Sequence, residues 1–427
     1  MNNTKKHNLK KSFAIQRINI LFGCCMLSML FATGQNTVSP YSIFGLGELQ
    51  NRGFSTIQSM GGAGIAFRPG NSLNNVNPAS YTGLDSLRII TEFGIQGKMY
   101  ELDSRSETQS GFTGNLNYVA IGFRYNDWMG GSFGFVPFSS VGYSIQFENN
   151  VEGSDEIYLS KYDGSGGITQ FYFSNAFKIG KHLSLGVTVS YLFGPLIQDE
   201  LILATDNVPS FKISRRDYLK SFYFDYGMQY MFKLKKTDVV LGAVFSNNQN
   251  LNSNHILELY EGSTNSMLQG TSYNTNYLVI PSIWGAGIGI SKKNRYQLLF
   301  DYHHQQWSEV TYPIQFNTFE NVNRYSLGTS VRPWESRATN KFYKNWVYRF
   351  GMNYQTSYLS FAGTPIEDKS VSFGVGIPVS RNISEVDFVV KLDSNGTTSN
   401  HLIRENYILF QVGLSLNEFA FIRRTFD

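Results

Sequence analysis

Most of this chain alternates apolar and polar side chains with a period of two residues. In residues 221–232 every second position is large and apolar, whereas the positions between them include Asp225 and Gln229. Residues 183–193 and 346–354 follow the same pattern. Because successive side chains of a β-strand point to opposite faces, each segment would form a strand with one apolar and one polar face. The pattern therefore predicts an all-β protein.

The length and chemistry of these segments favour a membrane barrel over a soluble sandwich. Strands of a sandwich run about five or six residues, whereas most of the alternating segments here are clearly longer. Aromatic residues make up 15% of the chain and gather towards segment ends, while the polar positions are rich in Gly, Ser, Asn and Gln. We therefore expect a transmembrane antiparallel β-barrel with lipid outside and water or a plug inside.

Fourteen such segments can be counted, an even number as a closed bacterial barrel requires. They lie near residues 87–101, 113–125, 130–149, 168–179, 183–199, 218–234, 238–247, 277–291, 295–308, 323–332, 346–357, 370–380, 383–393 and 404–416. The links alternate in length, which predicts short periplasmic turns and long outer loops, one of them at residues 248–276. The long link Pro333–Asn345 falls on the periplasmic side, so either this turn is extended or the count is off by a hairpin, within about 12 to 16 strands.

The first 34 residues have the features of a secretory signal peptide. A basic start is followed by the apolar run Ile18–Ala32, and cleavage is expected after Gly34. The alternative, a lipoprotein signal ending at Cys24, would leave apolar residues on the product. Both cysteines, Cys24 and Cys25, lie in this region. The mature chain would therefore contain no disulfide and no cysteine metal site.

Removal of the signal peptide also changes the charge balance. It holds five of the 36 Lys and Arg residues and none of the 32 Asp and Glu residues, which leaves 31 basic and 32 acidic residues. A nucleic-acid partner therefore has no support. No later apolar run reaches the roughly 18 residues that a membrane-spanning helix needs, but a barrel crosses a membrane with strands.

The segment between the signal peptide and the first strand, residues 35–85, is the part long enough to fill the wide lumen of such a barrel. Its small residues allow close backbone approach, and its asparagine amides can tie irregular backbone to the wall. The residues expected to form this hatch are Gly61, Gly62, Ala63, Gly64, Asn74, Asn75, Asn77, Pro78 and Ala79. A nucleotide-binding loop is excluded, because no strand precedes the glycines and the fingerprint is broken at Phe67.

The signal peptide, the run Gly61–Ala66, the tripeptide Asn77–Ala79 and the alternating strands together resemble the FadL-type outer-membrane transport protein family. The resemblance covers the whole architecture, but at residue level it covers only this short hatch motif. Related barrels that serve protein secretion carry similar hatch starts. The resemblance implies uptake of hydrophobic molecules, long-chain fatty acids in the best-known members, with sideways exit where the third strand kinks.

The third segment contains a proline where such a kink would lie. Pro137 cannot donate to the ladder and should bend the strand. With Phe138, Ser139 and Ser140 it forms the expected lateral portal. The alternative is a bulge that relieves barrel curvature without any transport role.

Charged residues within the strands are expected to face the lumen, because a cation facing lipid at the bilayer midplane would cost about 2–4 kcal/mol. Arg124, Arg324 and Arg349 are candidates for contact with a substrate carboxylate, which guanidinium groups bind in a bidentate manner. The adjacent His303 and His304 would face opposite sides of a strand and cannot share a metal. No catalytic constellation, metal site or cofactor site is expected.

The expected organisation is a signal peptide at 1–34, a hatch at 35–85, a barrel at 86–416 and a periplasmic tail at 417–427. The predicted function is uptake of hydrophobic, fatty-acid-like molecules across the outer membrane of a Gram-negative bacterium by a monomer. The partners would be membrane lipid, the apolar ligand, and a periplasmic or surface protein. The alternative is a barrel without transport activity that acts as a scaffold or shuttle in surface-protein secretion.

Overall fold

The computed structural model describes residues 38–150, 157–203, 209–262, 265–292, 295–310, 319–333, 342–361, 363–379 and 384–420. These described residues belong to one compact unit. The expected signal peptide, residues 1–34, lies outside the described residues. No helix in the described part of the chain is long and apolar enough to span a membrane.

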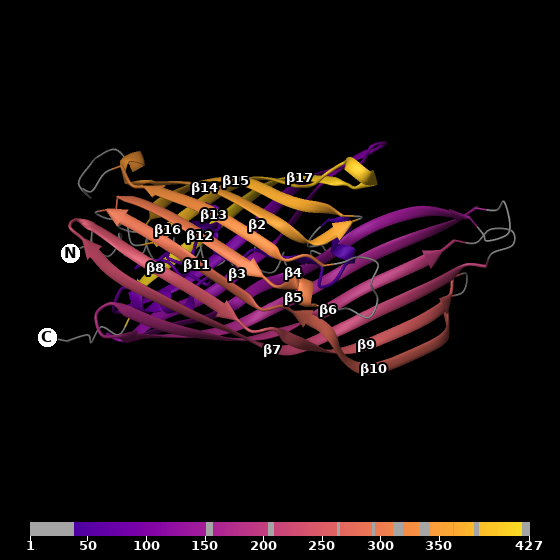
Figure 1. Cartoon of the computed structure of the whole chain (residues 1–427), viewed down its shortest axis with the longest axis horizontal. Helices are drawn as coiled ribbons and strands as arrows, with labels where there is room; N and C mark the ends of the chain where they lie inside the picture. Colours follow the sequence, from indigo (N-terminus) through magenta and orange to yellow (C-terminus); the bar gives the residue numbers. More distant parts are fainter. Residues whose placement is uncertain are drawn as a thin grey trace, which may run out of the picture. The chain divides into compact units, whose positions relative to one another are not determined.

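Antiparallel strands form a closed barrel whose strands run obliquely around the wall (Figure 1). Each strand from β2 to β17 pairs with at least one neighbour in the chain, and β17 pairs with β2 to close the wall. The strands are β1 Glu48–Leu49, β2 Arg88–Asp103, β3 Thr108–Asn126, β4 Met129–Asn150, β5 Ile157–Ile179, β6 Leu183–Ile202, β7 Phe211–Leu234, β8 Thr237–Ser246, β9 Gln249–Glu261, β10 Ser266–Ile280, β11 Ile283–Lys292, β12 Tyr296–Gln305, β13 Val322–Val331, β14 Val347–Phe361, β15 Thr364–Val379, β16 Ser384–Gly396 and β17 Arg404–Phe419.

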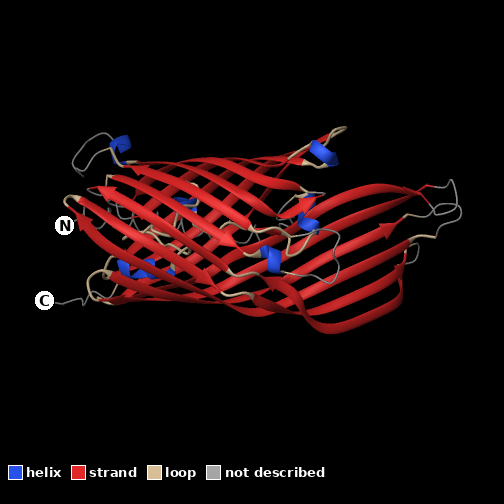
Figure 2. Ribbon diagram, viewed as in Figure 1, coloured by secondary structure: helices blue, strands red, loops and turns tan. Residues whose placement is uncertain are grey.

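Helical elements are few and short (Figure 2). They are η1 Pro40–Ile43, α2 Ser55–Gln58, η2 Pro78–Gly83, η3 Trp307–Glu309, η4 Phe342–Asn345 and η5 Ser399–His401. The first three belong to the segment that precedes the barrel, residues 38–87, which we call the N-terminal segment.

The wall has fourteen strands, because two of its strands are each interrupted once. β7 pairs with β8 along one half of its length and with β9 along the other half, so β8 and β9 form one interrupted strand. β10 and β11 form the next one, with the break at Pro281 and Ser282. The expected strand count is therefore confirmed. The expectation of a long loop at residues 248–276 is wrong, because most of these residues form the paired hairpin β9–β10.

Two further expectations about the links are decided by the pairing. β13 pairs directly with β14, so the link at 333–345 adds no strand between them in the described wall. The wall also extends beyond the expected end at residue 416, since β17 continues to Phe419. The remaining tail residues, 421–427, lie outside the described residues.

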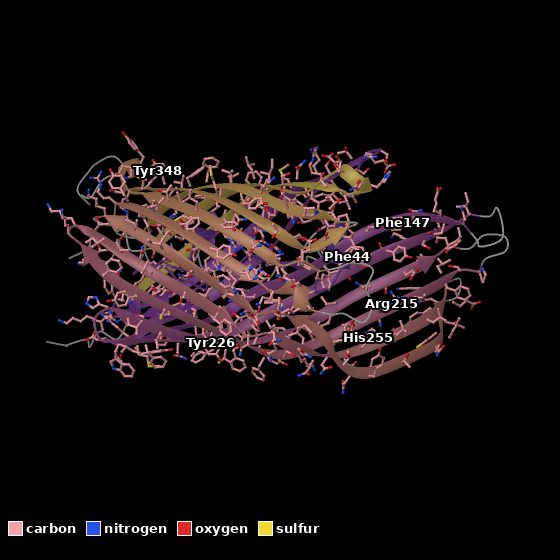
Figure 3. All side chains as sticks on the ribbon, in the orientation of Figure 1. Phe44, Phe147, Arg215, Tyr226, His255 and Tyr348 are labelled. Atoms are coloured by element: carbon pink, nitrogen blue, oxygen red, sulfur yellow. The ribbon has the colours of Figure 1, made fainter. Side chains whose placement is uncertain are left out.

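The alternation of side chains matches the two faces of the wall. Tyr226 and Tyr348 lie on the outer face and are 44% and 40% exposed (Figure 3). Tyr223, Asp225 and Gln229 on β7 point inwards and are buried. Apolar side chains therefore cover the outside, and polar or charged side chains line the inside, as a transmembrane barrel requires.

The N-terminal segment packs against the inner face of this wall through very short backbone separations. A Cβ atom on Gly351 of β14 would lie 1.9 Å from the backbone N of Gly61. Gly61 itself has a φ of 67°, which favours glycine. On β12, Asp301 accepts hydrogen bonds from the backbone N–H groups of Gly64 at 2.6 Å and Ile65 at 2.7 Å. The segment is therefore fixed to the wall by complementary shape and by buried hydrogen bonds.

Candidate functional site

The ladder between β3 and β4 is incomplete. β3 pairs with β4 only from Val119 to Asn126, and the last partner on β4 is Phe135. Beyond Phe135, β4 continues to pair with β5, while the other half of β3 pairs only with β2 among the described residues. Pro137 lies two residues further along β4, and the β4–β5 register shifts between Pro137 and Ser139. A bulge and the end of one ladder therefore coincide at the predicted kink.

The N-terminal segment occupies the edge of β4 that β3 leaves unpaired. Strand β1 pairs with β4 through Glu48 opposite Ser140 and Leu49 opposite Ser139. On either side of this pair, Gln50 donates its backbone N–H to Phe138 O at 3.0 Å, and Ser39 donates to Gly142 O at 2.9 Å. Residues 39–50 thus replace the missing neighbour strand. Buried backbone groups of β4 are satisfied in this way.

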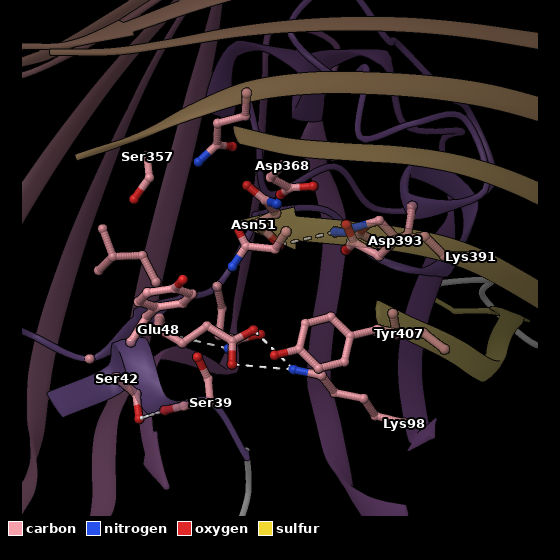
Figure 4. Close-up of a pocket in the computed structure, with 18 of the residues that line it drawn as sticks. Ser39, Ser42, Glu48, Asn51, Lys98, Ser357, Asp368, Lys391, Asp393 and Tyr407 are labelled. Carbon is pink, nitrogen blue, oxygen red and sulfur yellow. Dashed lines mark hydrogen bonds and ion pairs between the residues drawn. The ribbon is translucent and has the colours of Figure 1, made fainter. Parts of the chain in front are cut away.

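A polar cavity of about 210 Å³ lies between residues 39–51 and strands β2, β3 and β14 to β17. Lys98 Nζ lies 3.1 Å from Glu48 Oε1, and Lys391 Nζ lies 2.6 Å from Asp393 Oδ2 (Figure 4). The ammonium group of Lys98 also lies 3.7 Å from the centre of the Tyr407 ring. Charged side chains on both sides of this cavity suit water and polar groups and disfavour an apolar molecule.

Two contacts fix the first residues of the N-terminal segment to the wall. Ser39 Oγ donates to Glu405 Oε1 at 2.6 Å, and Tyr41 Oη donates to Ile403 O at 2.6 Å. Burial raises the pKa of Tyr41 to about 12, so its hydroxyl stays protonated and available as a donor. This end of the segment is therefore attached next to β17 as well as to β4.

A second, smaller cavity of about 100 Å³ lies between the N-terminal segment and strands including β4, β7 and β12. Its apolar lining includes Leu49 and Phe138, and its polar lining includes Arg324. Arg324 is buried, and its guanidinium donates to Asn353 Oδ1 at 2.8 Å and to Asn51 Oδ1 at 2.9 Å. The cavity combines apolar side chains with Arg324, whose partners in these bonds are neutral, and with an ion pair in which Arg52 Nη1 lies 2.9 Å from Asp225 Oδ1.

The three arginines predicted as carboxylate contacts do not come together. Arg124 lies near the end of β3, where it donates to Asn126 O and Asp127 O. Arg349 is paired with Glu385 and Asp387. Of the three, only Arg324 lines the cavity next to Phe138. The alternation of side chains along a strand predicts that an arginine points into the lumen. It does not predict the position of the arginine along the barrel axis or the residues that it contacts.

The residues predicted to form the hatch are buried, with the exception of partly exposed Asn75. Asn74 donates to Gly64 O and Phe67 O, each at 2.8 Å. Asn77 donates to Ile65 O at 2.8 Å and to Met228 O on β7 at 3.1 Å. Asn75 differs, because its Oδ1 atom is buried without a hydrogen-bond partner. The remaining members of this set are Gly61, Gly62, Ala63, Pro78 and Ala79.

The sequence interpretation missed several charged residues of the polar cavity. Lys98 has the same parity on β2 as Glu92, and both side chains are buried, so the signal was present in the alternation. Glu405, which accepts a hydrogen bond from Ser39 but does not line this cavity, likewise shares the parity of other inward residues of β17 and is 1% exposed. Glu48 could not be found in this way, because its contact with Lys98 joins residues far apart in the chain. Among the described residues, no group of three or more His, Cys, Asp or Glu side chains could hold a metal ion.

The BamG family model matches residues 14–427 of the chain. No curated protein matches it. Among solved structures, the CymD monoaromatic hydrocarbon channel is similar with 18% identity and a TM-score of 0.57, covering 90% of this chain and 100% of that one. The Pseudomonas putida toluene transporter TodX has 12% identity and a TM-score of 0.59, covering 86% and 98%. A Pseudomonas aeruginosa FadL homologue has 13% identity and a TM-score of 0.56, covering 88% and 100%.

At these identities the likeness establishes the fold alone. The resemblance to FadL-type barrels therefore holds for the architecture, while the matching family model carries a different name.

Proposed function

The chain belongs to the BamG family, and we propose that it is an outer-membrane transporter for hydrophobic, fatty-acid-like molecules that leave the lumen sideways between β3 and β4. The barrel works as a monomer in a Gram-negative outer membrane, with its short turns in the periplasm. Solved structures of similar fold include a monoaromatic hydrocarbon channel and two toluene transporters, which supports an apolar cargo.

One observation carries this proposal: β4 pairs with β1 of the N-terminal segment where it would otherwise pair with β3. A wall completed by β3 would close the barrel permanently. A wall completed by the two-residue strand β1 can open, because only a few hydrogen bonds hold it. Pro137, Phe138, Ser139 and Ser140 form the edge from which β1 would separate.

The cavity beside Phe138 is the proposed resting place of the cargo. Apolar side chains on its walls can contact a hydrocarbon chain, and Arg324 can bind a carboxylate head group. Arg124 and Arg349 have no part in this proposal, since neither lines this cavity. Movement of residues 39–50 would then connect the cavity to the gap in the wall.

A reversible disulfide tests whether this movement is needed. Leu49 and Ser139 are register partners, and both would be replaced by cysteine, Leu49→Cys with Ser139→Cys. Antiparallel partners have Cα atoms about 4.5–5.5 Å apart, which a disulfide can bridge. Cells carrying this variant should take up radiolabelled oleate slowly when oxidised and at the wild-type rate after reduction.

The control places the same disulfide in a part of the wall that should not open. Val390 and Phe410 are partners on β16 and β17, and their cysteine variants should leave uptake unchanged in both redox states. Equal oleate uptake by the oxidised and reduced Leu49→Cys, Ser139→Cys variant would exclude the portal.

A scaffold function is the second candidate, and one observation favours it. Met267, Leu268 and Tyr273 on β10 are 60%, 54% and 54% exposed. The hairpin β9–β10 carries them on the outer part of the strands, where a partner protein could bury them. Native mass spectrometry of the barrel in mild detergent separates the two candidates: a defined complex lost on Met267→Ser with Leu268→Ser supports the scaffold, and a monomer with bound lipid supports transport.

A further inference from the structure

Three amide side chains form a row across neighbouring strands on the inner face of the wall. Gln411 on β17 is the register partner of Gln96 on β2, and Gln96 is the register partner of Asn115 on β3. All three line the polar cavity between residues 39–51 and the wall. Partners on one face of a sheet have Cβ atoms about 4.5–5.5 Å apart, so these amides present adjacent donors and acceptors to the cavity.

A second set of polar side chains enters the same cavity from β14, β15 and β16. Gln355 on β14 is the register partner of Asp368 on β15, and Asp393 lies on β16 (Figure 4). The carboxylates of Asp368 and Asp393 lie close enough for their charges to act on each other. Lys391 forms an ion pair with Asp393, whereas Asp368 forms none in the described part of the chain.

Four polar atoms of these two sets are buried and have no hydrogen-bond partner among the described residues. Three of them are acceptors, namely Oε1 of Gln355, Oδ1 of Asp368 and Oδ1 of Asp393, and the fourth is the donor Nε2 of Gln411. Gln411 as a whole is 5% exposed. Buried polar groups are costly when they are unpaired. A ligand that fits this cavity must therefore both donate and accept hydrogen bonds.

This mixture of groups excludes two classes of ligand. A carboxylate or a phosphate offers only acceptors, and it would lie beside Asp368, a carboxylate without an ion pair among the described residues. An ammonium ion offers only donors and would leave Nε2 of Gln411 unpaired. A hydroxyl group donates one hydrogen bond and accepts others, so several hydroxyl groups on one molecule match both kinds of atom.

We propose that the polar cavity binds a neutral polyhydroxylated molecule, a single sugar unit. The volume of about 210 Å³ equals that of about seven water molecules, which accommodates one sugar ring and no longer chain. One sugar brings several hydroxyl groups at once, so it loses less freedom than the same number of separately ordered water molecules. The proposal goes beyond transport of apolar molecules, because the ligand and its site are polar.

Binding is measured on the full mature barrel in lauryldimethylamine oxide, a detergent without a sugar head group. Isothermal titration uses glucose, galactose and mannose as probes. Asn115→Ala and Gln411→Met each remove the hydrogen-bonding groups of one amide in the row, so the affinity should fall about three- to tenfold. Gln109→Ala is the matched control, because Gln109 also lies on β3 but is exposed and does not line the cavity.

A thiol inside the cavity tests where the sugar lies. Asn117 on β3 lines the cavity, and Asn117→Cys would be the single thiol after removal of residues 1–34. At a sugar concentration of about ten times Kd, about nine-tenths of the protein is occupied, so labelling by a small methanethiosulfonate should slow about tenfold. Gln109→Cys is the control and should react at the same rate with and without the sugar.

Three results would overturn the proposal. They are the absence of binding by all three sugars, an affinity that Asn115→Ala and Gln411→Met leave unchanged, and labelling of Asn117→Cys that the sugar does not slow. Neither experiment measures oleate uptake, so the outcome is independent of the transport test.

Discussion

Lys98 Nζ on β2 lies 3.1 Å from Glu48 Oε1 on β1, and this ion pair joins the N-terminal segment to the wall. The side chain of Lys98 is 8% exposed and that of Glu48 is 31% exposed. Glu48 is also the residue that faces Ser140 on the otherwise unpaired edge of β4. The same residue therefore takes part in the ladder that completes the wall and in the ion pair that fixes this ladder in place.

Loss of this ion pair should loosen β1. In Glu48→Gln, the hydrogen bond to a charged partner is weakened, which is worth about 1.5–3 kcal/mol. Local opening of β1 should then increase about tenfold or more. The measurement is the rate at which a polar maleimide labels Leu49→Cys, which would be the single thiol after removal of residues 1–34, because both natural cysteines lie there.

Glu367→Gln is the control for this labelling experiment. Glu367 pairs with Lys369 at 2.7 Å in an exposed position on β15. Its substitution should leave the labelling of position 49 unchanged. Equal rates in all three proteins would show that Glu48 does not hold β1.

Extension of the β3–β4 ladder should slow transport. Pro137→Thr supplies a backbone N–H two residues beyond Phe135, where the β3–β4 ladder now ends. One added hydrogen bond is worth about 1 kcal/mol and would reduce opening about fivefold. Oleate uptake should fall accordingly, while the barrel keeps its heat-modifiable migration on gels. Unchanged uptake with an intact barrel would leave Pro137 with the role of a bulge alone.

The sequence predicts the wall better than it predicts the site, for a physical reason. Alternation along a strand is local, so inward residues such as Asp301 and Arg324 are identified from parity alone. The partners of these residues lie far away in the chain: Asp301 binds Gly64, and Arg324 binds Asn51. The alternation of side chains along a strand cannot predict such contacts, because they depend on how the N-terminal segment folds inside the lumen.

The same limit explains the error at residues 248–276. The stretch is polar and contains several asparagines, which are typical of loops. Its strands β9 and β10 pair with each other, and β9 also pairs with β7 beyond the end of β8. This pairing, and not the alternation of apolar residues, makes the segment extended.

The close approach of Gly351 to Gly61 predicts a steric penalty. A Cβ at position 351 would lie 1.9 Å from Gly61 N, so either the N-terminal segment or β14 must shift. Gly351→Ala should lower the free energy of unfolding by about 1–3 kcal/mol, as overpacking does. Gly114→Ala is the control, since its Cβ would meet no described atom closer than 3.4 Å. Urea titration of the refolded barrel in detergent measures both, and equal midpoints would mean that the segment does not seat against β14.

Asp301 should be the most sensitive single anchor of the N-terminal segment. It is 0% exposed and accepts the backbone N–H groups of Gly64 and Ile65 through one oxygen. In Asp301→Ala both donors lose their acceptor inside the barrel, at a cost of about 1–3 kcal/mol for each. Asp238→Asn is the control, because Asp238 is exposed and lies 3.6 Å from Lys233, a pair that contributes little. The expected result is a large fall in the urea midpoint for Asp301→Ala alone, together with faster proteolysis within residues 38–87. A midpoint equal to that of Asp238→Asn would mean that water replaces the carboxylate, and that the segment is held chiefly by its shape.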